Sequence, residues 1–236
     1  MLTRDQIEEL NALLVRVDED EDEEDDEEDD WFALEFAEPD SAQDIAALEG
    51  ILGFGIPAAL KALYQRCGAF GHASYGLSWQ TIKVRSASWL LERLRAGGDA
   101  APAMGLLNYI HDSWGGRTEL EVIDPELAKI VNENYVVFGE RIVSDDVYDY
   151  WYVDRNGLFG CLHFDQDQGG HNVWKLETLG NIVPPEDPAL SGEERRAQTL
   201  LEVANFSGDE DIFPGKELDE LITQQFEACA QSLAEG

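Results

Sequence analysis

One segment gathers the residue types that can hold a metal ion or move a proton. It reads CLHFDQDQGGH, and its candidate side chains are His163, Asp165, Asp167 and His171. Imidazole and carboxylate groups serve as metal ligands and as general bases. From Asp165 onward, however, the composition is that of a turn, and the later glutamate of a calcium loop is absent. We therefore place a metal-dependent hydrolase that uses His163, Asp165 and His171 only third among our hypotheses.

A second segment, NYIHDSWGG, places a histidine beside an acid. His111 and Asp112 are adjacent, and Ser113 follows directly. Three consecutive side chains do not align easily as a catalytic triad, and the chain has no Gly-x-Ser-x-Gly motif. It also has no dinucleotide-binding fingerprint, zinc-ligand spacing or kinase motif. We therefore expect no catalytic residues, no metal and no cofactor.

A third segment, SDDVYDYWYVD, interleaves acids with aromatic residues. Tyrosine and tryptophan surrounded by charge are typical of protein-binding hot spots, although ordinary packing between strands gives the same pattern. Alternation along a strand puts Tyr148 and Tyr150 on one face and Asp149 on the other. The candidate partner-binding residues are Asp145, Asp146, Tyr148, Asp149 and Tyr150.

The charge of the chain restricts its partners. The 236 residues carry a formal net charge of −34, and residues 18–30 are all Asp or Glu. Such a polyanion repels nucleic acid phosphates, so we expect no direct nucleic acid binding and a basic protein as the partner. No apolar run is long enough for a membrane helix, and no signal peptide begins the chain. We therefore expect a cytoplasmic protein that does not bind a membrane.

A pair of glycines precedes a lysine-bearing helical run in LGFGIPAALKALYQRCG, residues 52–68. A phosphate-binding loop would follow a buried strand and place its lysine at the helix start. Here the preceding pattern is helical, and Lys61 lies a full turn inside the second helix. We interpret the segment as a corner between two helices, with Leu52 and Phe54 buried between them.

The remaining patterns predict an α+β fold, in which a central antiparallel sheet is flanked by helices. Alternating and β-branched residues predict strands at 134–143, 147–153 and 158–164, and a further one at 171–176. Helical spacing recurs after Ser191 and from Leu218 to Leu233. We divide the chain into three parts: an N-terminal helix at 1–17, an acidic disordered linker at 18–30, and a single α+β domain at 31–236.

The order of these motifs resembles the SUKH superfamily, also called the SMI1/KNR4 family. The resemblance rests on IAALEGILGFGIPAALKALYQRCGAFG (45–71) and on VVFGERIVSDDVYDYWYVDRNGLFGCLHFDQD (136–167). It implies an α+β domain without catalytic residues of its own. Bacterial members of the family are similar to immunity proteins, which neutralise toxin domains of polymorphic toxin systems, often nucleases. Fungal members are regulatory scaffolds.

These observations lead to a ranked set of hypotheses. The first is a non-enzymatic immunity-type protein that covers the active site of a basic toxin domain. The second is an SMI1/KNR4-like scaffold that binds other proteins without inhibiting them, and the hydrolase is the third.

Overall fold

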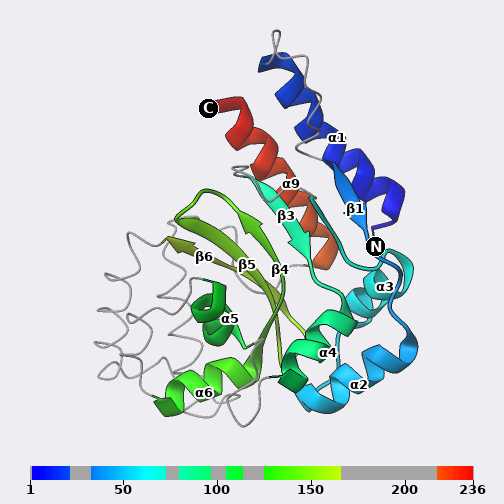
Figure 1. The fold of residues 1–236 in the computed structure, drawn as a ribbon, viewed down its shortest axis with the longest axis vertical. Coiled ribbons are helices and arrows are strands. Elements are labelled where there is room, and N and C mark those ends of the chain that lie inside the picture. The colour runs from blue at the N-terminus through cyan, green and yellow to red at the C-terminus, as the bar shows by residue number, and fades with distance from the viewer. Residues whose placement is uncertain are drawn as a thin grey trace.

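A six-stranded antiparallel sheet lies at the centre of the molecule (Figure 1). The computed structural model describes residues 2–21, 33–72, 80–96, 105–113, 125–165 and 217–235. Strand order follows the chain, so that each strand pairs with its neighbours in sequence. The strands are β1 (Leu34–Phe36), β2 (Phe70–His72), β3 (Thr81–Val84), β4 (Tyr135–Ile142), β5 (Val147–Asp154) and β6 (Phe159–Asp165). The predicted α+β class and its antiparallel sheet are confirmed.

Helices cover both faces of this sheet. They are α1 (Arg4–Glu21), α2 (Ala42–Leu52), α3 (Ala58–Arg66), α4 (Ala87–Ala96), α5 (Leu106–Ser113), α6 (Pro125–Asn134) and α9 (Leu218–Glu235). Helix α9 packs against β3, β6 and α1, whereas α5 and α6 pack against β4. Within the described ranges, no helix is long and apolar enough to cross a membrane.

Strands β4, β5 and β6 form the part of the sheet that the sequence predicts best. Their β-branched and aromatic residues bury both faces, and Trp151 and Tyr150 are fully buried on opposite sides of β5. A β-bulge between Val137 and Gly139 sets Gly139 opposite Trp151. A Cβ atom at Gly139 would lie 2.8 Å from the indole ring, so only glycine fits this close approach.

The N-terminal helix is longer than predicted. Helix α1 does not end at residue 17 but continues to Glu21, over the first four acids of the 18–30 run. Each added helical residue gains a backbone hydrogen bond, and glutamate is a good helix former, so a few like charges do not stop propagation. The side chains of Ile7 and Leu14 are fully buried in the same core as the sheet. Residues 22–30 of the acidic run lie outside the described residues.

The corner between α2 and α3 is a helix–helix bend, as predicted. Gly53 ends α2 with a φ of 73°, the left-handed conformation that glycine adopts most readily. Lys61 Nζ lies 2.6 Å from a carboxylate oxygen of Glu49, and the same oxygen accepts a hydrogen bond from the Ile56 N–H at 2.7 Å. The hydrogen bond from Lys61 lowers the pKa of Glu49. The lysine therefore holds the corner through Glu49.

Burial of the corner differs from the prediction. Leu52 and Phe54 are only half-buried, although both pack against the core, whereas Ile56 is buried. Ile56, two residues after Phe54, is the residue of this corner that is buried in the core.

Candidate functional site

The turn between β4 and β5 carries two of the predicted partner-binding residues. Strand β4 ends at Ile142 and β5 begins at Val147, and the Val143 N–H donates to the Val147 carbonyl at 2.9 Å. Asp145 and Asp146 lie between the two strands, and both are exposed. The turn thus presents two adjacent carboxylates to solvent at one end of the central hairpin.

Tyr148 forms the aromatic part of the same surface. Its side chain is half-buried, and its ring stacks on Tyr150 at a centroid distance of 5.8 Å and an interplanar angle of 14°. Burial raises the pKa of Tyr148, and the carboxylates of Glu140, Asp145 and Asp146 raise it further. The phenol therefore stays neutral, and its hydroxyl can donate a hydrogen bond within a field of negative charge.

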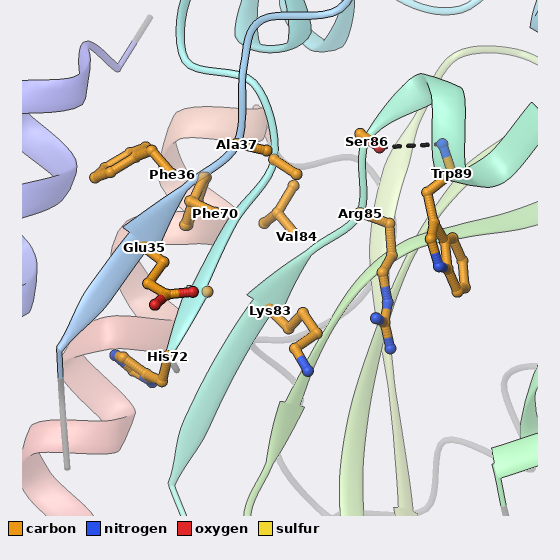
Figure 2. Close-up of a pocket in the computed structure, with 12 residues that line it drawn as sticks. Glu35, Phe36, Ala37, Phe70, His72, Lys83, Val84, Arg85, Ser86 and Trp89 are labelled. Carbon is orange, nitrogen blue, oxygen red and sulfur yellow. Dashed lines mark hydrogen bonds between the residues drawn. The ribbon is translucent and has the colours of Figure 1, made fainter. Parts of the chain in front are cut away.

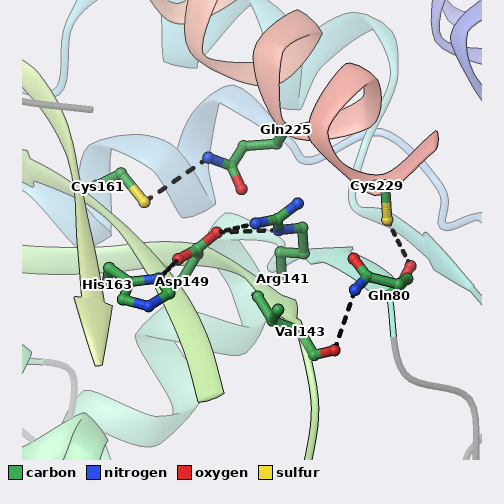
Figure 3. A network of polar contacts seen from close by, with 8 residues as sticks. All are labelled: Gln80, Arg141, Val143, Asp149, Cys161, His163, Gln225 and Cys229. Carbon is green, nitrogen blue, oxygen red and sulfur yellow. Dashed lines mark hydrogen bonds and ion pairs between the residues drawn. The ribbon is translucent and has the colours of Figure 1, made fainter. Parts of the chain in front are cut away.

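Asp149 is not a surface residue, contrary to the prediction. Its exposed fraction is 0%, and its carboxylate is held inside the fold by two neighbours (Figure 3). One oxygen accepts from Arg141 through Nε at 2.9 Å and Nη2 at 2.7 Å, and the other lies 2.7 Å from Nδ1 of His163. A buried carboxylate is tolerated only with such partners, so Asp149 ties three strands together.

Tyr150 is also buried, with an exposed fraction of 0%. Its ring makes an edge contact with Tyr109 of α5, with the centroids 5.6 Å apart. The prediction failed for Tyr150 and Asp149 for the same reason: β5 is an inner strand, and helices cover both of its faces. Of the five predicted contact residues, the structure brings Asp145, Asp146 and Tyr148 together at the surface.

The side chains considered as candidate metal ligands are not placed as the sequence pattern suggested. His163 pairs with Asp149 on the neighbouring strand, while Asp167 and His171 lie outside the described residues. Within the described ranges, no group of three or more histidine, cysteine or acidic residues could hold a metal ion. His111 lies on α5, and the side chain of Asp112 is not among those described.

An open pocket of about 310 Å³ lies over β1, β2 and β3 (Figure 2). Gly71 is among the residues that line it, and this glycine pairs with Glu35 of β1 on one side and with Lys83 of β3 on the other. Arg85 and Trp89 continue the lining toward the start of α4. The pocket therefore combines both signs of charge with one indole ring.

The wall at Arg85 is held by a buried cluster. Arg85 Nη2 lies 2.6 Å from a Glu140 oxygen and donates to the Tyr109 hydroxyl at 3.0 Å, while its guanidinium lies 4.5 Å from the centre of a Trp89 ring. Burial, followed by the negative charge of Glu140, raises the pKa of Tyr109. The sequence interpretation missed this pocket because it recognised neither β2 nor β3. The four residues of β3, TIKV (81–84), do alternate, but a run this short is too weak a signal to predict a strand, and β2 has no such alternation.

Comparisons with known proteins add no family assignment. No protein-family model matches the chain, and no curated protein matches its sequence.

Proposed function

We propose that this chain is a cytoplasmic, non-enzymatic protein of the immunity type, which binds and neutralises a basic toxin domain of a polymorphic toxin system. A nuclease is the target class that partner charge favours, because proteins that handle nucleic acids are typically basic. The resemblance of residues 45–71 and 136–167 to the SUKH superfamily supports the proposal, as does the net charge of −34.

The observation that carries the proposal is the surface formed by Asp145, Asp146 and Tyr148, called here the hairpin surface. Two exposed carboxylates lie beside a half-buried tyrosine that is neutral and stacked on a buried ring. An aromatic anchor with charge around it is the composition of a binding hot spot. Exposed acids would speed the encounter with a basic partner, and the tyrosine would slow its release.

The hairpin behind this surface is held in place before a partner arrives. The ion pair between Arg141 and Asp149 joins β4 to β5 one residue pair behind Ile142 and Tyr148. Ordering flexible segments on binding costs free energy, so a surface on a braced hairpin binds more tightly than the same residues on a loop.

A scaffold that binds other proteins without inhibiting them is the second candidate, because the hairpin surface would serve either role. The two functions differ in what happens to the partner. An immunity protein has a partner that kills cells when expressed alone and is harmless when co-expressed, whereas the partner of a scaffold is not toxic.

The experiment that tests the proposal has two stages. The protein is used to capture partners from its source cells, with the double variant Asp145→Lys/Asp146→Lys as the control bait. A captured basic protein is then expressed alone and together with the chain. We expect toxicity that co-expression of the wild-type chain abolishes. A captured partner that is harmless alone would support the scaffold, and a purified chain with catalytic turnover would contradict both.

A further inference from the structure

Strand register places two residues of opposite charge in the pocket over β1, β2 and β3. Glu35 pairs with Gly71, and Gly71 pairs with Lys83, and all three residues line the pocket (Figure 2). Residues that pair across antiparallel strands point to the same face of the sheet. Glu35 and Lys83 therefore lie on one face, two strand spacings or about 10 Å apart at the backbone.

The two cationic residues of the lining already face an acid of this chain. Lys83 pairs with Glu140 across β3 and β4, and Arg85 Nη2 lies 2.6 Å from a Glu140 oxygen. Opposite charges on paired residues of neighbouring strands attract each other. The positive charge in the pocket is therefore opposed from within the fold.

Glu35 differs from these residues. Its side chain is exposed and, among the described residues, it makes no hydrogen bond or ion pair. A carboxylate without an internal counter-charge attracts a cation, and the net charge of −34 adds to this attraction. An anionic ligand would be repelled by the same field. The pocket therefore selects a positively charged group.

The size of the pocket favours a single protein side chain as its occupant. Small-molecule sites measure about 300–1,000 Å³ and enclose most of their ligand. This pocket, at about 310 Å³, is at the lower limit and is open. Protein interfaces place single anchor residues in such pockets, and arginine is one of the commonest anchors. Its planar guanidinium also matches the geometry of a carboxylate such as Glu35.

The pocket and the hairpin surface lie on the same face of the sheet. Lys83 pairs with Glu140, and Glu140 pairs with Tyr150 of β5. Tyr148, two residues before Tyr150, points to the same side, and the two rings stack. Four strand spacings separate β1 from β5, about 19 Å. A standard interface covers about 800 Å² on each partner, which equals a disc about 32 Å across, so one partner can contact both places.

We propose that the pocket over β1, β2 and β3 binds an arginine side chain of the basic partner, with the guanidinium paired to the Glu35 carboxylate. The inference rests on the proposed function for the nature of the partner. It adds a second contact to the hairpin surface, at the other side of the same sheet face.

The first test needs no partner and uses N-acetyl-arginine amide as the probe. In NMR titrations of the wild type, we expect the Gly71 amide and Trp89 indole signals to shift, because both residues line the pocket. Glu35→Gln should abolish these shifts. Glu38→Gln removes an exposed carboxylate just beyond β1, outside the pocket lining, and should keep them.

The neutral analogue N-acetyl-citrulline amide should leave both signals in place. Three results would overturn the proposal: no shift of the Gly71 amide in the wild type, equal shifts in the two variants, or equal shifts with the two probes.

The second test measures the dissociation constant of the captured basic partner. Glu35→Gln should weaken binding about tenfold, and Glu38→Gln should leave it nearly unchanged. Unchanged affinity in Glu35→Gln would overturn the proposal. So would a wild-type dimer in analytical ultracentrifugation that Glu35→Gln abolishes, because a second copy would then be the occupant. A harmless partner that still loses affinity in Glu35→Gln would contradict the immunity role and support the pocket contact.

Discussion

Arg141 and Asp149 lie opposite each other on β4 and β5, and the guanidinium donates to one carboxylate oxygen through Nε at 2.9 Å and Nη2 at 2.7 Å. Neither side chain reaches solvent appreciably. The pair therefore acts on the fold rather than on a partner directly, and it sits immediately behind the exposed turn that we propose as the binding surface.

Removing one member of this pair should be strongly destabilising. Asp149→Ala leaves the buried guanidinium without its counter-charge, and we expect a loss of about 3–5 kcal/mol in the free energy of unfolding. Urea denaturation measures this loss. Asp145→Ala is the control, because Asp145 is exposed and its replacement should change stability by no more than about 0.5 kcal/mol. Equal effects of the two substitutions would show that the pair does not brace the hairpin.

The stability of the protein should fall with acid through His72. Burial, with a smaller contribution from Lys83, lowers the pKa of His72 from 6.5 to about 4. Its Nδ1 accepts from the Ile82 N–H at 2.9 Å, so the folded state requires the neutral ring. The unfolded chain binds a proton at a higher pH than the folded one. The stabilisation that neutral His72 provides is therefore complete above about pH 6.5 and is lost as pH falls toward 4. The total loss in the free energy of unfolding is about 3 kcal/mol.

The measurement is the free energy of unfolding between pH 7 and pH 4, compared with that of His72→Gln. The variant should be less stable at pH 7 and should show a shallower decline with acid. Parallel pH profiles would mean that His72 is not held neutral by the fold.

Gly139 should not tolerate a side chain. A Cβ atom there would lie 2.8 Å from the Trp151 ring and 3.0 Å from the Lys83 carbonyl oxygen. We expect Gly139→Ala to cost about 1–3 kcal/mol, measured by urea denaturation. Gly50→Ala is the control, because Gly50 lies on α2 and a Cβ atom there would have no other atom within 4 Å. This substitution should stabilise the protein by about 0.5–1 kcal/mol. Stabilisation by both substitutions would mean that the bulge relaxes freely.

The corner between α2 and α3 should depend more on Ile56 than on Phe54. Ile56 is buried, and its truncation to alanine should cost about 2–5 kcal/mol. Phe54 is half-buried, so Phe54→Ala should cost less than the full core value, about 1–2 kcal/mol. Thermal unfolding of both variants shows which substitution costs more stability. A larger loss of stability in Phe54→Ala than in Ile56→Ala would contradict the burial described here.

The parts of the fold that sequence patterns predicted are those with strong local signals. The three strands from Tyr135 to Asp165 are long and rich in β-branched and aromatic residues, and the final helix has a clear apolar stripe. Strands β1 and β2 have three residues each and β3 has four, too few for alternation to be recognised. The strand predicted at 171–176 and the helix after Ser191 lie outside the described residues.

For the candidate site, the limit of sequence-based prediction was burial rather than the length of the elements. Asp145 and Asp146 were proposed as charged contact residues, and both are exposed in the turn between β4 and β5. Alternation alone could not indicate that both faces of β5 are covered, because coverage depends on α5 and α9, which are distant in sequence. The pairing of His163 with Asp149 could not be predicted either, because the two residues become neighbours only through the register of β5 with β6.

The rate of association with the captured basic partner tests the central claim most directly. It should be measured at several salt concentrations for the wild type, for Asp145→Lys/Asp146→Lys and for Glu8→Lys/Glu9→Lys, which makes the same change in net charge at exposed positions of α1. We predict that reversal at the hairpin surface slows association about tenfold at low salt and flattens its salt dependence, while the α1 variant changes much less. Equal rates and salt slopes for the two double variants would contradict the proposal that the hairpin surface binds the partner.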